Sequence, residues 1–429
     1  MSEFRIPRIQ VVIDNAVVRK YLTKSPRHIL VLLVILFYLA LESYYLFFRF
    51  HGHIQDLSLY QGIASKTMEG QVPFRDFRIE YPIFALIPIL IPGLLSQLAG
   101  GSFESFACWF VFQNLVLGLV MAWIISRSDA SGKAFPRFLI ATLFAFPIFL
   151  FRFDPFPALL TLLAIVNVSH KPFAAGMALM VSVAAKLYSI VLFPVFGLYY
   201  VFNSDGKKLL WLIAGAGCIC AAILSCIAWL GMDAATDFMH YHLLRGIQIE
   251  SLAGGILLIL EQTGLIELDV THSFGAMHLV TPLSDLVLKC INIAMPVCFI
   301  SMAVFLLRAF YKSFSLPGGI TFRQLNAAAA AQILLFILLN KVLSPQYLIW
   351  LLPLIPFCRF KASVIFTVAL MFTVLIFPGH YYGLISKQLP MVVILNIRNG
   401  LLIWLLIELL SEIAPVRTRD ISAPPIPSA

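Results

Sequence analysis

Apolar residues along this chain gather into long runs that are separated by short polar stretches. A helix needs roughly 20 mainly apolar residues to cross a bilayer, and most of these runs have that length. A soluble all-α protein would show a polar face at helical period, which most of the runs lack. The pattern therefore predicts an all-α, polytopic membrane protein with about 12 transmembrane helices (11–13).

The expected spans divide the chain into a single membrane domain with two short ends. The spans lie at about 29–50, 105–126, 138–152, 156–169, 172–187, 188–203, 208–231, 282–308, 322–341, 343–358, 362–379 and 391–411. Residues 1–28 are then a cytoplasmic N-terminal segment, 29–412 the transmembrane domain, and 413–429 a disordered, proline-rich cytoplasmic tail.

One further apolar segment, Ile83–Leu98, is expected to stay on the outer side as an interfacial or re-entrant helix. It contains Pro88 and Pro92, which lack the backbone donors of a regular helix. With the N-terminus in the cytoplasm, most of the 30 lysines and arginines lie on the inner side, as the positive-inside rule requires. A crossing at 83–98 would move the later cationic loops to the outer side.

The composition agrees with a membrane protein and disfavours a nucleic-acid-binding, metal-binding or disulfide-rich protein. Hydrophobic residues make up 61% of the chain and charged residues 12%, with a formal net charge of +9. In a soluble protein that charge would favour nucleic acid as a partner, but here the cations lie at span ends, where they set topology and meet anionic lipid. The seven cysteines lie in apolar runs without the spacing of a metal site or a disulfide framework.

The loop after the first span is unusually rich in charge for a simple connector. Its carboxylates and cations, within residues 56–80, are Asp56, Glu69, Asp76, Glu80, Lys66, Arg75 and Arg78. Charges at a membrane face, beside so apolar a protein, favour a site for a polar substrate. Asp56 alone would also suit a helix cap, but Asp154 is expected on the same face. The two carboxylates are a candidate pair for acid/base chemistry or substrate binding.

Three cations are expected on the same outer face as Asp56. Lys186 interrupts a long apolar run, Lys341 lies between two spans, and Arg245 follows a histidine-containing segment. Snorkelling would explain either lysine, and a salt bridge with Glu250 would explain Arg245. Converging on one face, the three suit an anionic lipid headgroup, most simply a phosphate. The histidines nearby lack metal-ligand spacing with carboxylates, so no metal and no cofactor is expected.

Several short motifs in this order resemble the GT-C membrane glycosyltransferases, closest to bacterial polyprenol-phosphate-mannose-dependent mannosyltransferases. The motifs are Asp56…Tyr60, Gly70-Gln-Val-Pro-Phe-Arg-Asp-Phe77…Glu80-Tyr-Pro82, Arg152-Phe-Asp154, Ala185-Lys-Leu-Tyr188, His242…Arg245-Gly-Ile-Gln-Ile-Glu-Ser251 and Ser344-Pro-Gln-Tyr347…Trp350. The usual Tyr-Pro-Pro is Tyr-Pro-Ile here, and no Asp-x-Asp pair occurs at Asp154, which speaks against the metal-using oligosaccharyltransferase branch.

The resemblance implies a GT-C-like fold, interfacial helices in the first outer loop, and a catalytic aspartate at Asp56 acting as general base. The donor would be a sugar on a polyprenyl monophosphate, transferred with inversion to a glycan, glycolipid or protein at the outer face of a bacterial inner membrane. Mannose is the family default, and another hexose or a pentose stays open. The expected substrate-binding residues are Tyr60, Arg75, Asp76, Glu80, Asp154, Lys186, His242, Arg245, Glu250, Lys341 and Gln346.

A transporter or flippase of a lipid-linked or anionic solute is the alternative function. Such proteins place polar residues near the bilayer midplane, in broken helices of two related halves. In this chain the polar residues are expected on one side of the membrane, and the sequence does not divide into two related halves. Cleavage of the sugar–phosphate bond separates the two functions.

Overall fold

The computed structural model describes residues 51–203, 205–316 and 319–414, and the predictions for 1–50 and 415–429 lie outside them. The described part is mostly helical, and six helices are long and apolar enough to cross a membrane. The expectation of a helical membrane protein is therefore confirmed, while the 12 spans and the GT-C arrangement stay predictions.

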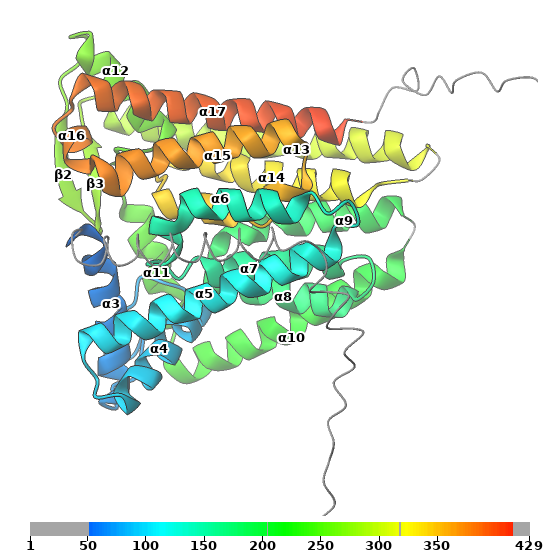
Figure 1. Ribbon diagram of the computed structural model, residues 1–429, viewed down its shortest axis with the longest axis horizontal. Coiled ribbons are helices and arrows are strands. Elements are labelled where there is room, and N and C mark those ends of the chain that lie inside the picture. The colour runs from blue at the N-terminus through cyan, green and yellow to red at the C-terminus, as the bar shows by residue number, and fades with distance from the viewer. Residues whose placement is uncertain (1–50, 204, 317–318, 415–429) are drawn as a thin grey trace, which may run out of the picture. The chain divides into compact units, whose positions relative to one another are not determined.

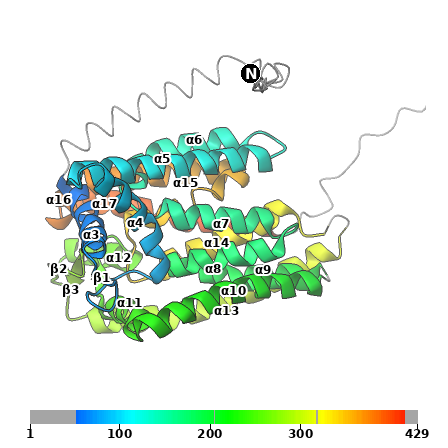
Figure 2. The same cartoon turned by 90° about the horizontal axis from the view of Figure 1, so that it is seen from below.

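The long helices run side by side in both views (Figures 1 and 2). They are α5 (Phe103–Ser128), α10 (Gly206–Leu230), α13 (Ser284–Phe314), α14 (Phe322–Leu339), α15 (Phe360–Val374) with the π-turn η5 (Leu375–Gly379), and α17 (Leu389–Ile413). Shorter apolar helices complete the bundle: α6 (Ala134–Phe149), α7 (Pro155–Asn167), α8 (Pro172–Ala185), the 3₁₀ turn η2 (Leu187–Val191) and α9 (Leu192–Phe202).

Small residues allow the closest helix packing in the bundle. A Cβ added to Gly176 of α8 would lie 2.0 Å from the carbonyl oxygen of Leu212, and one added to Gly215 of α10 would lie 2.0 Å from that of Phe173. Helices in membranes associate through such small-residue contacts, because lipid offers no hydrophobic driving force between them. In α14, the buried run Ala327–Ala331 has the same small-residue character.

The segment 343–358, expected as a helical span, does not form an α-helix. The chain instead forms 3₁₀ turns, η3 (Pro345–Trp350) and η4 (Ile355–Phe357), joined by irregular turns. Prolines in this segment lack the donors of an α-helix. Irregular backbone at membrane depth needs partners inside the protein, and the carbonyls find them. Asn326 Nδ2 donates to Leu354 at 2.9 Å, and Arg137 donates to Cys358 at 2.7 Å.

Elements outside the long helices gather at one end of the bundle (Figures 1 and 2). They are α3 (His51–Met68), η1 (Ile83–Ala85), α4 (Leu86–Leu98), α11 (Asp233–Leu244), α12 (Leu252–Gln262), α16 (Tyr381–Ile385), and the strands β1 (Ile247–Gln248), β2 (Asp269–Ser273) and β3 (Ala276–Val280). The segment 83–98 is thus helical and packs against α3 and α5, and its failure to cross stays a prediction.

A small antiparallel sheet, in the order β1-β3-β2, was not expected from the sequence. Ser273 pairs with Ala276, which leaves Phe274 and Gly275 as a two-residue loop. Both have positive φ, 48° and 64°, as a type I′ hairpin turn requires. The sheet carries this hairpin tip to the cavity described below.

Candidate functional site

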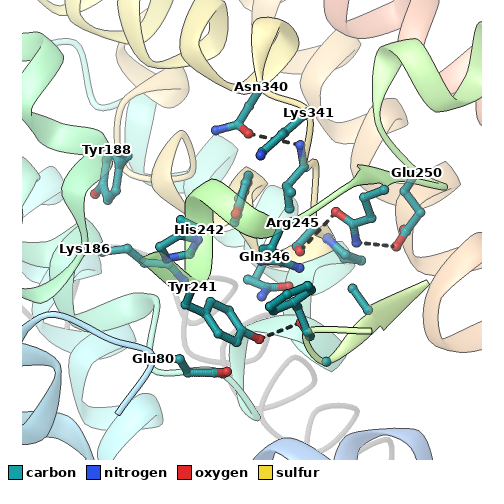
Figure 3. A pocket seen from close by; sticks show the side chains of 18 of the residues that line it. Glu80, Lys186, Tyr188, Tyr241, His242, Arg245, Glu250, Asn340, Lys341 and Gln346 are labelled. Carbon is teal, nitrogen blue, oxygen red and sulfur yellow. Dashed lines mark hydrogen bonds between the residues drawn. The ribbon is translucent and has the colours of Figure 1, made fainter. Parts of the chain in front are cut away.

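A cavity of about 820 Å³ opens at the end of the bundle where α3, α11, α16 and the sheet gather. Its walls combine charged, aromatic and apolar side chains from segments that are far apart in sequence (Figure 3). Met295 of α13 and Phe336 of α14 supply part of the apolar wall. The cavity is large enough for a drug-sized or sugar-phosphate ligand, for which pockets usually span 300–1,000 Å³.

Asp56 lines this cavity and forms an ion pair with Arg152. The Asp56 side chain is 30% exposed, whereas Arg152 is almost fully buried in the turn between α6 and α7. Asn114 of α5 fixes that turn, because its amide donates to the carbonyls of Leu150 at 2.8 Å and Arg152 at 2.9 Å. A rigid turn thus holds a cation against the carboxylate that the sequence singles out as catalytic.

Asp154 is fully buried behind the cavity and does not line it. Its Oδ1 accepts hydrogen bonds from Lys186 Nζ at 2.7 Å and from Trp350 Nε1 at 2.6 Å. Lys186 follows α8 and does line the cavity, where Tyr347 and Trp350 flank its ammonium group at 5.7 and 5.5 Å. Asp154 therefore orients a cation and has no access of its own to a ligand.

Arg245 and Lys341, expected to bind phosphate, both line the cavity near Lys186 and His242 (Figure 3). Arg245 ends α11 and is 8% exposed, and its Nε has no hydrogen-bond partner within the described chain. Lys341 has a structural contact as well, because its ammonium donates to the Leu243 carbonyl at 2.8 Å. Positive charges from separate segments thus meet on one wall, as an anionic ligand would require.

His242 contributes a neutral ring to this cationic wall. Burial in the cavity wall is the main cause that lowers the pKa of His242 to about 4. The charges of Arg245, Lys186 and Lys341 act in the same direction. At neutral pH the imidazole therefore offers one donor and one acceptor and no charge.

Glu250 also lines the cavity, and it is only 2% exposed. Burial raises the pKa of Glu250 to about 7, although Arg398, Tyr381 and Arg152 oppose that shift. The local turn is tight because Gly254 has no side chain, and a Cβ there would lie 2.4 Å from the Gln248 carbonyl oxygen. No ion pair joins Arg245 to Glu250 among the described residues, so the salt-bridge alternative is not observed.

The mouth of the cavity is aromatic and includes two further expected residues. Glu80 interacts with the hydroxyl groups of Tyr81 and Tyr241. The Tyr241 hydroxyl also donates to the Phe274 carbonyl at 2.6 Å, which ties α11 to the hairpin tip (Figure 3). Gln346 lines the cavity from η3.

Besides Asp154, three expected binding residues lie outside the cavity lining. Tyr60 is 2% exposed and stacks on Phe110 with ring centroids 5.3 Å apart, so it belongs to the core. Arg75 and Asp76 pair with one another on the surface, and Asp76 also accepts from the Val72 backbone at 2.7 Å. The structure therefore gives Tyr60 a packing contact and the other two a turn-forming contact.

The structure adds site residues that the sequence reasoning did not single out: Arg152, Tyr241, Gln248, Trp350, Tyr381 and the positioning groups Asn114 and Arg398. A signal existed for α17, because Asn396, Arg398 and Asn399 interrupt an apolar span. The other residues depend on contacts between distant segments, which periodicity does not reveal.

Within the described residues, no group of three or more His, Cys, Asp or Glu side chains could hold a metal ion.

Comparison with known proteins adds no family to this picture. No protein-family model matches the chain, and a search of curated proteins finds no similar sequence.

Proposed function

We propose that the protein is a membrane glycosyltransferase that moves a sugar from a polyprenyl-monophosphate donor to an acceptor hydroxyl group. The observation that carries the proposal is one cavity with an accessible carboxylate, Asp56, and a separate wall of cations formed by Lys186, Arg245 and Lys341. A phosphate-linked sugar needs both features, a base for the acceptor and positive charge for the departing phosphate.

In the proposed reaction, the Asp56 carboxylate takes the proton of the acceptor hydroxyl group as its oxygen bonds to the anomeric carbon. The bond between that carbon and the phosphate oxygen breaks, and its electron pair stays on the phosphate. The leaving polyprenyl phosphate carries more negative charge than the diester donor, because a monoester can ionise twice. The cationic wall therefore stabilises the product side and the transition state more than the donor.

The remaining walls suit the other parts of such a substrate. Met295 and Phe336 offer apolar surface for the polyprenyl chain, and both come from helices apolar enough to cross a membrane. We place the site at the outer face of a bacterial inner membrane, where a lipid-linked donor would enter from the bilayer. The sugar is mannose or another hexose or pentose, and the acceptor is a glycan, glycolipid or protein.

The test uses membranes that contain the full protein and a polyprenyl-phosphate donor radiolabelled in its sugar. Transfer predicts that radioactivity moves to an acceptor while free polyprenyl phosphate is produced. If the labelled lipid crosses the bilayer with its sugar–phosphate bond intact, the protein is a flippase and the proposal is wrong.

A further inference from the structure

A buried arginine in α17 lies directly behind the cavity. Arg398 is 0% exposed and sits within a helix that is apolar enough to cross a membrane. Its Nη2 donates to the backbone carbonyl of Glu250 at 2.7 Å, while Nε and Nη1 have no hydrogen-bond partner within the described chain. A charge at membrane depth is costly and faces a partner or a functional site in most proteins.

Arg398 binds the Glu250 backbone, and its charge also acts on the Glu250 carboxylate, although no direct ion pair joins the two among the described residues. Glu250 lines the cavity, its Oε2 accepts from Gln248 at 3.5 Å, and its Oε1 has no hydrogen-bond partner within the described chain. The positive charges of Arg398 on α17 and of Arg152 in the turn between α6 and α7 act on this carboxylate, and Tyr381 of α16 interacts with it. A buried carboxylate with an unused oxygen beside a cavity can accept a hydrogen bond from a ligand.

The position of Glu250 in the cavity indicates which part of the ligand it would contact. Arg152 interacts with both Asp56 and Glu250, so the two carboxylates flank one cation. The proposed phosphate-binding cations Lys186, Arg245 and Lys341 line the same cavity, and in Figure 3 Arg245 lies between Lys186 and Glu250. A sugar bonded to that phosphate and attacked near Asp56 would therefore present its hydroxyl groups to Glu250.

We infer that Arg398 is a positioning residue that keeps the Glu250 carboxylate ionised and directed into the cavity, where it accepts a hydrogen bond from a hydroxyl group of the donor sugar. This inference depends on the proposed function. It assigns the sugar-recognition role to the α17 side of the cavity and makes the Arg398–Glu250 pair a determinant of sugar affinity.

Burial and nearby cations shift the pKa of Glu250 in opposite directions. Burial alone disfavours the charged carboxylate, and each nearby cation favours it. With the pKa of Glu250 at about 7, loss of the Arg398 charge leaves a larger fraction of the carboxyl group protonated at neutral pH. A protonated group no longer accepts through both oxygens, so sugar transfer should need a higher pH.

The first experiment measures kcat and KM for the donor against pH. Arg398→Gln should move the acid limb of kcat/KM upward by about one pH unit, since removing a nearby cation typically shifts a pKa by that order. Its KM for the donor should rise while the acceptor KM stays unchanged. Arg398→Lys should restore the limb to within about half a unit. A changed acceptor KM with an unchanged donor KM would overturn the sugar assignment.

Asn399→Ala is the matched structural control. Asn399 lies next to Arg398 and donates to the carbonyl of Ser251, the neighbour of Glu250, at 3.3 Å. Its loss weakens the same contact between helices without changing any charge. If Arg398→Gln only lowers activity, as Asn399→Ala should, and leaves the acid limb in place, Arg398 is structural and the inference is wrong.

A second measurement, independent of activity, follows the Tm of the purified protein against pH. Because folding raises the pKa of Glu250 from 4.5 to about 7, its contribution is stabilising below pH 4.5 and is lost as pH rises to 7. Glu250→Gln should remove this decline, and Arg398→Gln should extend it above pH 7. An unchanged decline in Arg398→Gln would overturn the coupling. If these Tm shifts appear but the protein transfers no sugar, the coupling between Arg398 and Glu250 is confirmed. The sugar contact and the proposed function are then wrong.

Discussion

Lys186 and Asp154 form the best-defined charge pair of the site, with Lys186 Nζ 2.7 Å from Asp154 Oδ1. The carboxylate side chain is 1% exposed and the lysine side chain 17%, so the carboxylate is sealed from solvent while the ammonium group borders the cavity. Trp350 holds the same oxygen at 2.6 Å. The pair therefore fixes an ammonium group in the cavity wall and leaves that group available on its cavity side.

Breaking this pair should destabilise the protein. Asp154→Asn leaves the Lys186 ammonium buried without its counter-charge, which costs about 3–5 kcal/mol of unfolding free energy. Denaturant titration in detergent measures the loss. The double variant Asp154→Leu/Lys186→Met should recover much of the stability and remain inactive. Equal stability of Asp154→Asn and the unsubstituted protein would contradict the account.

Arg245 should contribute directly to the chemical step. Arg245→Gln removes a nearly buried cation from the phosphate wall, and kcat/KM for the donor should fall by an amount equivalent to about 2–4 kcal/mol. Arg78→Gln is the control, because Arg78 is 90% exposed and pairs with Asp237 at 3.6 Å on the surface. Equal effects of the two substitutions would show that Arg245 acts only through net charge.

His242 should not make donor binding depend on pH near neutrality. With its pKa lowered to about 4, the ring is neutral from pH 6 to 8 and gains charge only in more acidic solution. His242 should therefore add nothing to the pH dependence of donor affinity over that range, where Glu250 titrates, and His242→Gln should change donor affinity only as the pH falls toward 4. A change in Kd between pH 6 and 8 that His242→Gln removes would contradict this.

The segment 83–98 should remain on the outer side of the membrane. Ala99, just after α4, is exposed, and Ser131 is exposed in the loop that joins α5 to α6. Single cysteines at the two positions, in a protein without its seven native cysteines, can be labelled in intact cells with an impermeant thiol reagent. Ala99→Cys should react and Ser131→Cys should be protected, and the reverse pattern would overturn the assigned sides.

Sequence reasoning reached the class of the fold and the main charged residues, because both depend on composition that is local in the chain. Long apolar runs predicted the helices, Lys186 stood out as a charge that interrupts such a run, and Arg245 and Lys341 stood out as charges in polar segments beside the spans. The structure places all three on one cavity. The prediction that they share a membrane face came from short loops and the positive-inside rule, and their meeting in one cavity is consistent with it.

The features that sequence reasoning missed depend on tertiary contacts. In the sequence, Arg398 is a single charge within an apolar span. In the structure it donates a hydrogen bond to the Glu250 carbonyl, 148 residues away in the chain. The 343–358 segment looks like a span because its apolar run is long enough, yet it forms 3₁₀ turns and no α-helix, and Asn326 donates to its Leu354 carbonyl. Tyr60 looks like a ligand contact in its motif but packs on Phe110.

The most direct test of the central claim, that Asp56 drives sugar transfer in this cavity, compares two carboxylate substitutions in the same segment. Asp56→Asn keeps the shape of a cavity-lining side chain and removes its basicity, whereas Asp76→Asn changes a surface carboxylate outside the cavity. Turnover of a radiolabelled polyprenyl-phosphate sugar should fall by about 10²–10⁴-fold in Asp56→Asn, in line with loss of a general base. Asp76→Asn should stay near the unsubstituted rate. Near-normal turnover by a folded Asp56→Asn protein would contradict the account.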